Sequence, residues 1–283
     1  MGKMQLFVSS DVSGMHQDLD TVAQIYSPVA KYIDGMELLA LGDTYEINKK
    51  IAKAHEFGFK QVSLHGKIGA LGDSLLDTIK VIIVESQLIP TKTAISDFGA
   101  TTEILLHSPE VKKQNKVLST AHNLKYLWVE NDLPQLKALQ MAVNEVKELR
   151  SKGIKCGLML DLCHAIGGHH LKKGNFNREW HNLKEYINNI LIIEEINGEK
   201  IWQGIHLPIG TLRHDSLPID HHIHLSGFML GDIADWVRKA GIQRVVIENQ
   251  NGIGLFGISE GMILKQQKRV ENIFERLKNH KII

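Results

Sequence analysis

The stretch Gly157-Leu-Met-Leu-Asp161-Leu-Cys-His164-Ala165 decides how the rest of the chain is interpreted. Its apolar run is typical of a buried strand in a parallel sheet that is covered on both faces. The run ends at a carboxylate, Asp161, and an imidazole, His164, follows three residues later. An ionised Asp and a neutral His are both ligands for divalent metals such as zinc. The stretch therefore predicts a strand whose carboxyl end carries two candidate metal ligands.

Runs of the same kind recur along the chain and alternate with amphipathic helical segments. The predicted strands are Met4–Ser9, Met36–Leu41, Gln61–His65, Glu103–His107, Tyr126–Glu130, Lys155–Asp161, Ile201–His206 and Arg244–Glu248. The predicted helices include Ile51–Phe57, Leu133–Lys152, Lys184–Glu195 and Glu260–Asn279. Alternating strands and helices indicate βαβ units and a parallel sheet. Eight such units in 283 residues predict an α/β fold, the (β/α)8 TIM barrel, which typically takes about 250 residues. No linker or composition shift divides the chain, so residues 1–283 are predicted to form a single TIM-barrel domain.

The composition is that of an ordinary globular protein, with 43% hydrophobic and 23% charged residues. A net charge of +1 gives no electrostatic argument for or against a nucleic-acid partner. The amino terminus lacks a signal-peptide pattern, and no stretch approaches the roughly 20 apolar residues of a membrane span, so a cytoplasmic location is expected. Cys156 and Cys163 are too far apart along one extended strand for a disulfide and are predicted to be free thiols.

Metal-ligand residue types stand at the carboxyl ends of six predicted strands. They are His65, His107, Glu130, Asp161, His206 and Glu248. In a TIM barrel the carboxyl ends of the strands meet at one rim, so these side chains are expected to converge on one cavity. Burying so many carboxylates and imidazoles would be costly without a cation. The alternative is a hydrogen-bonded cluster without metal.

Further candidate ligands lie in the loops. The long connection between Pro208 and Gly227 carries Asp220 and His222, and structureless loops of this length are usually functional or disordered. The full set of candidate metal ligands is His65, His107, Glu130, Asp161, His164, His206, Asp220, His222 and Glu248. These exceed what one ion can use, so two or three ions are expected, with Glu130 or Glu248 bridging. Multi-metal sites suit phosphoryl chemistry. The candidate substrate-binding residues are Lys67, Asn131, Arg213 and Gln250.

The order of these residues resembles that of endonuclease IV (AP endonuclease family 2), a metal-dependent family within the xylose-isomerase-like TIM barrel superfamily. Asp161-Leu-Cys-His-Ala165 resembles the family's Asp-Thr-Cys-His-Ala, and Val129-Glu-Asn131 matches its Glu-Asn after the fifth strand. His107-Ser-Pro109 resembles its His-Pro-Gly, and the Asp220-x-His222 pair is the most discriminating match. The resemblance covers the third to the eighth strand. It implies three zinc ions, a bridging Glu130, and a metal-bound hydroxide that attacks a phosphodiester.

The sequence departs from the endonuclease IV pattern where that family contacts DNA. Its members read a bent duplex with arginine- and aromatic-bearing loops after the early strands. Here Gly42-Asp-Thr-Tyr-Glu-Ile47 contains no arginine, and His65 is followed by Gly-Lys-Ile-Gly instead of the expected Pro-Tyr. The first strand carries Val8-Ser-Ser10 where the family has a His-Val-Ser-like run. The metal chemistry is therefore expected to be shared, whereas the DNA-recognition loops are not matched.

Three functional hypotheses remain open. The preferred one is a zinc-dependent hydrolase of a phosphodiester or phosphate ester, abasic-site DNA included, with Glu130 and Glu248 as catalytic carboxylates. The second is a sugar isomerase or epimerase that uses one Mn, Co or Mg ion and two carboxylates to move protons. Its expected ligands are Glu130, Asp161, His206 and Glu248, and it leaves other imidazoles without metal. The third is a non-catalytic metal- or ligand-binding barrel. Neither the substrate nor the oligomeric state follows from the sequence, because barrel loops carry specificity.

Overall fold

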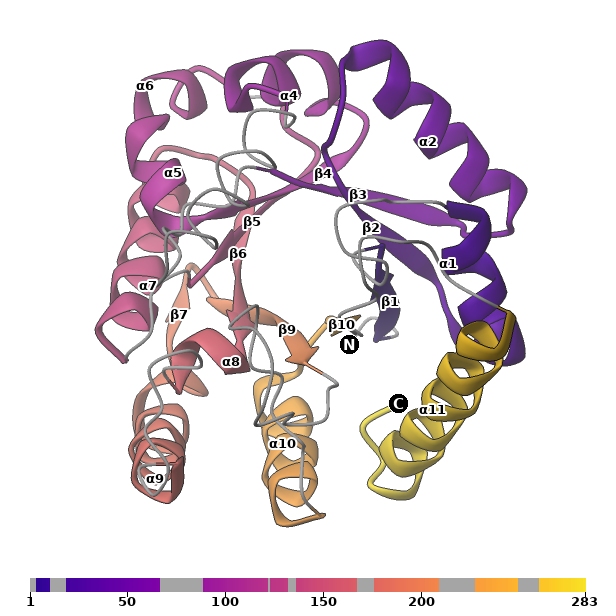
Figure 1. Cartoon of the computed structure of the whole chain (residues 1–283). Helices are drawn as coiled ribbons and strands as arrows, with labels where there is room; N and C mark the ends of the chain where they lie inside the picture. The colour runs from indigo at the N-terminus through magenta and orange to yellow at the C-terminus, as the bar shows by residue number, and fades with distance from the viewer. Residues whose placement is uncertain are drawn as a thin grey trace, which may run out of the picture.

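The computed structural model describes residues 4–10, 19–66, 89–121, 123–131, 136–166, 176–208, 227–248 and 260–283. Parallel strands form a closed barrel, and the helices lie outside the ring of strands (Figure 1). Around the barrel the strands are β1 (Gln5–Ser9), β2 (Gly35–Leu39), β3 (Gln61–His65), β4 (Glu103–His107), β5 (Leu127–Glu130), β6 (Cys156–Asp161), β9 (Trp202–Pro208) and β10 (Arg244–Glu248). β10 pairs with β1 and closes the ring. The predicted TIM barrel is confirmed, and every predicted strand overlaps an observed one.

The helices follow the strands in the expected alternation. They are α1 (Leu19–Tyr26), α2 (Thr44–Glu56), α4 (Thr91–Phe98), α5 (Ser108–Lys113), α6 (Asn115–Leu118), α7 (Leu136–Ser151), α8 (Leu162–Ala165), α9 (Phe176–Tyr186), α10 (Gly227–Ala240) and α11 (Glu260–Asn279). A 3-10 helix, η1 (Ser27–Tyr32), follows α1, and a π-helical turn, η3 (Ile187–Leu191), follows α9. α11 matches its predicted bounds, and it packs beside α1, so the last helix of the chain contacts the first (Figure 1).

The helix predicted over Lys184–Glu195 is wrong at its carboxyl end. The helical segment ends at Leu191, and Glu195 belongs to a hairpin of β7 (Glu195–Ile196) and β8 (Glu199–Lys200). The turn residues Asn197 and Gly198 have φ angles of 53° and 78°. Positive φ at both central positions matches a type I′ turn, for which Asn-Gly is the preferred pair. This local turn signal outweighs the apolar periodicity on which the prediction depended.

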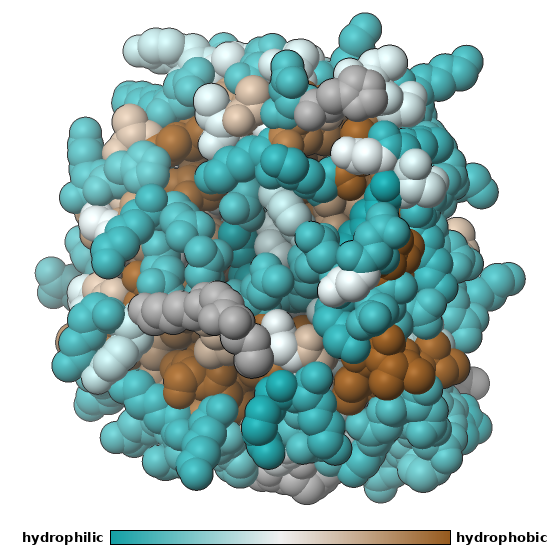
Figure 2. Space-filling view, turned by 180° about the vertical axis from the view of Figure 1, so that it is seen from behind, coloured by the Kyte–Doolittle hydropathy of each residue, from teal (hydrophilic) through white to brown (hydrophobic). Residues whose placement is uncertain are grey.

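Polar and charged side chains cover most of the face seen in Figure 2, with hydrophobic patches between them. Within the described residues, none of the helices has both the length and the apolar character that crossing a membrane requires. Cys156 is a free, buried thiol, as predicted, whereas the side chain of Cys163 lies outside the described part of the chain.

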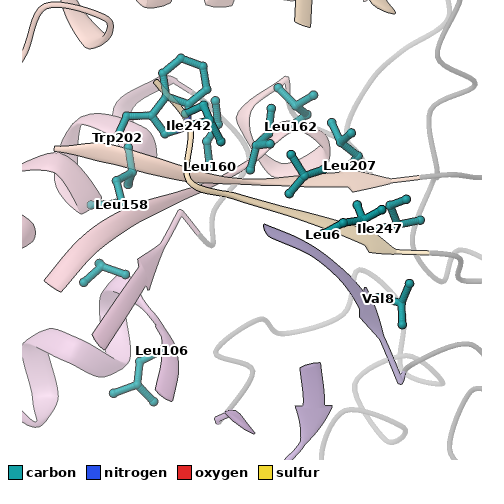
Figure 3. Close-up of a cluster of buried hydrophobic side chains, with 14 of the residues drawn as sticks. Leu6, Val8, Leu106, Leu158, Leu160, Leu162, Trp202, Leu207, Ile242 and Ile247 are labelled. Atoms are coloured by element: carbon teal, nitrogen blue, oxygen red, sulfur yellow. The ribbon is translucent and has the colours of Figure 1, made fainter. Parts of the chain in front are cut away.

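Side chains along each strand alternate between the two sides of the barrel wall. Leu6, Val8, Leu158 and Ile247 belong to one large cluster that also contains apolar side chains of the helices (Figure 3). Each is at most 3% exposed, and burying one such side chain contributes roughly 1.5–3 kcal/mol. The outer face of the barrel wall is therefore apolar and covered by the helices, which accounts for much of the hydrophobic character of the strands in the sequence.

The inside of the barrel contains a small apolar plug. It consists of Phe7, Leu105, Trp128, Met159 and Val246. Gly35 leaves room for it, because a Cβ at this glycine would lie 2.6 Å from the Phe7 ring and 2.7 Å from the Gln61 carbonyl oxygen. Beneath the plug, the buried Arg244 guanidinium lies 3.8 Å from the centroid of the Phe7 ring and pairs with Glu103. The plug closes the barrel toward the amino-terminal ends of the strands.

Candidate metal centre

The polar residues of the barrel lie directly above the plug. Four residues of the plug are each followed, two positions later on the same strand, by a buried ionisable side chain: His107, Glu130, Asp161 and Glu248. His65 on β3 and His206 on β9 join them, and all six are at most 9% exposed. Because strand residues two apart point to the same side, the sequence places these groups inside the barrel whenever the plug residues are inside. The structure brings the six predicted strand-end residues together.

Glu130 lies at the centre of this group. Its Oε2 atom is 3.0 Å from His107 Nε2 and 3.4 Å from His65 Nε2. The two imidazoles also approach each other, with 3.2 Å between their Nε2 atoms. One carboxylate oxygen and two imidazole nitrogens thus face one small space, which is a donor set typical of zinc.

The second oxygen of Glu130 faces a different histidine. His206 Nδ1 lies 3.0 Å from Glu130 Oε1 and 3.1 Å from Glu248 Oε1. Asp161 Oδ2 is 4.0 Å from the same nitrogen. Three carboxylates therefore surround one imidazole nitrogen, and Glu130 faces both histidine groups, which is the geometry that a bridging ligand needs.

Asp161 is held in place by its neighbours in the chain. Its Oδ1 atom accepts a hydrogen bond from the backbone N–H of His164 at 2.8 Å and so caps the short helix α8. Its backbone N–H donates to Asn131 Oδ1, and its carbonyl accepts from Asn131 Nδ2, both at 2.9 Å. His164 is half-buried, with Nε2 4.0 Å from Asp161 Oδ2. Asn131 was predicted as a substrate-binding residue, but both of its polar atoms engage Asp161, so a contact with substrate stays a prediction.

Glu37 on β2 is a residue of the site that the sequence analysis missed. It is completely buried, and its Oε1 atom lies 3.2 Å from His65 Nδ1 and 3.4 Å from His206 Nε2. The signal in the sequence is a single carboxylate inside the apolar run Gly35-Met-Glu-Leu-Leu39. It was missed because only the last residue of each strand was considered, whereas Glu37 lies two residues before the end of β2.

The buried charges perturb one another strongly. Burial raises the pKa of Glu37, but the attraction of His206 and the contact with His65 outweigh burial and hold this pKa at about 2. Burial likewise opposes ionisation of Glu130, yet His206 and His107 keep the pKa of Glu130 well below its usual range. Burial lowers the pKa of His206, whereas the carboxylates of Glu130, Glu37 and Glu248 raise it well above its usual value.

Asp161 responds in the opposite direction from Glu37. Burial raises its pKa, His164 lowers it, and the negative charges of Glu248 and Glu130 raise it, with a result of about 7. The carboxylates of Glu37, Glu130, Asp161 and Glu248 therefore need compensating positive charge. Protons on His206 and Asp161 supply part of it, and a divalent cation would supply the same compensation in their place.

Several buried polar atoms in this site fit a cation. Both oxygens of Glu37, Oε2 of Glu130 and both ring nitrogens of His206 have no aligned hydrogen-bond partner within the described part of the chain. Leaving such atoms unsatisfied costs about 1–3 kcal/mol each. The donor atoms fall into three groups that are each no more than 4.8 Å across: His65, His107 and Glu130; Glu37, His206 and Glu248; and Glu130, Asp161 and His164. Imidazole and carboxylate donors in such groups suit zinc, manganese or cobalt.

Five predicted site residues cannot be placed. Lys67, Arg213, Asp220, His222 and Gln250 lie outside the described residues. Their roles as metal-ligating or substrate-binding residues stay predictions.

Comparisons with known proteins bear on the fold. No family model and no curated protein matches this sequence. A crystal structure of D-psicose 3-epimerase in the presence of D-fructose aligns with a TM-score of 0.50 at 13% identity, over 96% of this chain and 98% of that chain. The IOLI protein with a bound zinc atom aligns with a TM-score of 0.50 at 12% identity, over 99% and 97%.

A xylose isomerase-like TIM barrel/4-hydroxyphenylpyruvate dioxygenase fusion protein aligns with a TM-score of 0.50 at 11% identity, over 98% of this chain and 43% of that chain. None of these three proteins is named as an endonuclease IV, so that resemblance depends on the sequence motifs alone. At such low identity the likeness concerns the fold. The chain shares the TIM-barrel fold of these proteins, and groups of metal-ligand residues lie near the carboxyl ends of its strands.

Proposed function

We propose that this protein is a divalent-metal-dependent isomerase or epimerase that acts on a small sugar. The observation that carries the proposal is the set of three carboxylates around His206 Nδ1, with Glu130 Oε1 at 3.0 Å, Glu248 Oε1 at 3.1 Å and Asp161 Oδ2 at 4.0 Å. Four strands supply this compact, oxygen-rich set, which suits manganese, cobalt or magnesium. The fold shared with D-psicose 3-epimerase supports a sugar as the substrate.

The residues of the site can divide the work of such a reaction. Glu130, Asp161, His206 and Glu248 would hold the cation, which would polarise the oxygens of a substrate's adjacent hydroxyl and carbonyl groups. Glu130 and Glu248 would remove a proton from the carbon beside the carbonyl and return it to the neighbouring carbon or to the opposite face. Asn131 would keep the Asp161 backbone in place through its two hydrogen bonds. The apolar plug would restrict entry of substrate to the carboxyl-terminal rim.

A multinuclear phosphoesterase is the second candidate, and one observation favours it. Glu130 faces His65 and His107 with one oxygen and His206 with the other, as a carboxylate shared by two ions would. Its remaining support is the resemblance of the motifs to endonuclease IV. In this reading His65 and His107 ligate metal, whereas in the isomerase they stay free of it and are available to hold substrate oxygens.

Hydrogen exchange with solvent separates the two candidates. We would load the protein with manganese or cobalt, incubate it with a panel of ketoses and aldoses in D2O, and follow the products by proton NMR. Proton transfer through a carboxylate places deuterium on the carbon of the product, whereas hydrolysis of a phosphodiester does not. The same preparation would be assayed on bis(p-nitrophenyl) phosphate and on abasic-site DNA.

Matched variants complete this test. Glu248→Gln should abolish deuterium incorporation, and Glu110→Gln should leave it unchanged because Glu110, buried on α5, belongs to none of the three donor groups and accepts a hydrogen bond from Thr91. Turnover of phosphodiesters without turnover of any sugar would replace the proposal with the second candidate. Sugar conversion without deuterium in the product would contradict the role assigned to the carboxylates.

A further inference from the structure

Glu37 lies beside two histidine rings, His65 and His206, and faces on each ring the nitrogen that points away from Glu130. The Oε1 atom of Glu37 lies 3.2 Å from His65 Nδ1 and 3.4 Å from His206 Nε2. The other nitrogen of each ring faces Glu130, with His65 Nε2 at 3.4 Å from Oε2 and His206 Nδ1 at 3.0 Å from Oε1. One carboxylate oxygen is thus common to two imidazoles that come from different strands of the barrel.

We propose that Glu37 is a positioning residue that fixes the tautomer of His206 and of His65. It makes His206 present Nδ1 to the metal and His65 turn Nε2 toward Glu130, while the protons on His206 Nε2 and His65 Nδ1 face Glu37. A histidine that ligates a metal usually gives its other N–H to a carboxylate or a carbonyl, which fixes the tautomer and the orientation of the ring. The inference rests on the cation of the proposed function and is independent of the substrate.

The backbone and the side chain of Glu37 are both fixed by their surroundings. Its backbone is fixed between β1 and β3, where it is paired in register with Ser9 and Ser63, and its carbonyl accepts a hydrogen bond from Ser10 N–H at 2.8 Å. Its side chain is completely buried, and neither oxygen has an aligned hydrogen-bond partner among the residues that the structure describes. The two imidazoles are therefore the groups whose N–H can donate to its lone pairs, while its charge also acts on the buried Arg244 guanidinium.

A carboxylate suits this position better than its amide would. A carboxylate oxygen can accept from two N–H groups, whereas glutamine offers one carbonyl oxygen and an NH2 group that would face a ring N–H as a second donor. Glu37→Gln keeps the volume of the side chain and removes this double acceptance. Loss of such an outer-shell partner typically weakens metal binding by about 10–100-fold.

The first test is a titration of chelator-treated protein with Mn2+ and Zn2+ by calorimetry. Glu37→Gln should bind each metal about 10–100-fold more weakly than the unmodified chain. Glu110→Gln is the matched control, because Glu110 is also a buried carboxylate, is 5% exposed, and accepts hydrogen bonds from Thr91 and Gln114 outside the site. It should bind metal within about twofold of the unmodified chain. Equal affinity in Glu37→Gln would overturn the proposal.

The second test identifies the nitrogens directly and does not depend on the stability of any variant. The unmodified chain, labelled with 15N-histidine and loaded with 113Cd2+, should show cadmium coupling at His206 Nδ1, with protons on His206 Nε2 and His65 Nδ1. Spectra of His65→Gln and His206→Gln assign the signals. Cadmium coupling to His206 Nε2, or a proton on His65 Nε2 in place of Nδ1, would overturn the proposal. If the predicted couplings are found but the protein converts no sugar, the proposed function is wrong and the role of Glu37 is still supported.

Discussion

Glu130 and His206 face each other inside the barrel, with 3.0 Å between Oε1 and Nδ1. The other oxygen of Glu130 lies 3.0 Å from His107 Nε2. A single carboxylate on β5 therefore links two groups of donors that come from opposite directions around the barrel. Its removal should affect more of the site than the removal of any carboxylate that faces one group only.

We expect Glu130→Gln to lose metal more severely than Glu248→Gln. Replacing Glu130 removes negative charge beside His65 and His107 and also beside His206. Among the described histidines, Glu248 pairs only with His206, at 3.1 Å. The metal affinity of Glu130→Gln should fall by more than about 100-fold, beyond what loss of an outer-shell partner costs. Elemental analysis after dialysis and calorimetric titration would measure this. Retention of the full metal content by Glu130→Gln would contradict its central position.

The number of bound ions should distinguish the two enzymatic candidates. For the isomerase we expect one ion per chain after purification without chelators, and His107→Ala should still bind it. For the phosphoesterase we expect two to three ions, and His107→Ala should lose one of them, because the group of His65, His107 and Glu130 would then lack a ligand. Elemental analysis of the unmodified chain and of His107→Ala at equal concentration would measure the number of ions per chain. Reconstitution with an excess of metal, followed by gel filtration, controls for loss during purification.

The stability of the metal-free protein should decrease as the pH rises from 6 to 8. The pKa of His206 is raised well above 6.5 in the folded chain, so the folded state keeps a proton that the unfolded state loses, and this stabilisation disappears as the pH rises through the folded pKa. Asp161, with its pKa raised to about 7, adds destabilisation between about pH 4 and pH 7, because only the unfolded chain ionises freely there. Glu37, with its pKa at about 2, contributes nothing in this window.

Thermal melts at pH 6, 7 and 8 in the presence of EDTA would measure this trend. Added Mn2+ should reverse it, because metal binding requires deprotonated ligands and becomes tighter as the pH rises. At a metal concentration 100 times the Kd, the stabilisation should reach about 2.7 kcal/mol. A metal-free protein that is more stable at pH 8 than at pH 6 would show that His206 and Asp161 are not the protonated groups.

The packing of the plug predicts opposite effects for two glycine substitutions. Gly35→Ala would place a Cβ 2.6 Å from the Phe7 ring and 2.7 Å from a backbone oxygen, so it should destabilise the protein by about 1–3 kcal/mol. Gly231 lies within α10, and no described residue comes within 4 Å of a Cβ added there, so Gly231→Ala should stabilise the protein by about 0.5–1 kcal/mol because glycine is a poor helix former. Urea denaturation followed by circular dichroism would measure both. Similar midpoints for the two variants would contradict this account of the plug.

The sequence by itself determined the barrel and much of its rim. Strand-length apolar runs alternate with helical segments, and this period depends only on local side-chain order, so the eight strands could be located within a residue or two. Asp161 and His164 could be paired for the same reason, because Asp161 caps the helix that begins at the next residue. The Asn197-Gly198 hairpin is equally local, because Asn-Gly is the preferred pair for two central positions with positive φ.

Only the tertiary structure decided how these residues meet. Glu37 reaches His65 on the neighbouring strand and His206 on β9, although β2 and β9 do not pair in the sheet. Strands of a closed barrel are tilted and staggered, so residues at different distances from their strand ends come to the same height around the axis. The sequence gives the distance of a residue from the end of its own strand, but its height along the barrel axis depends on the stagger of the closed sheet. The place of Glu37 in the site therefore follows from the tertiary structure alone.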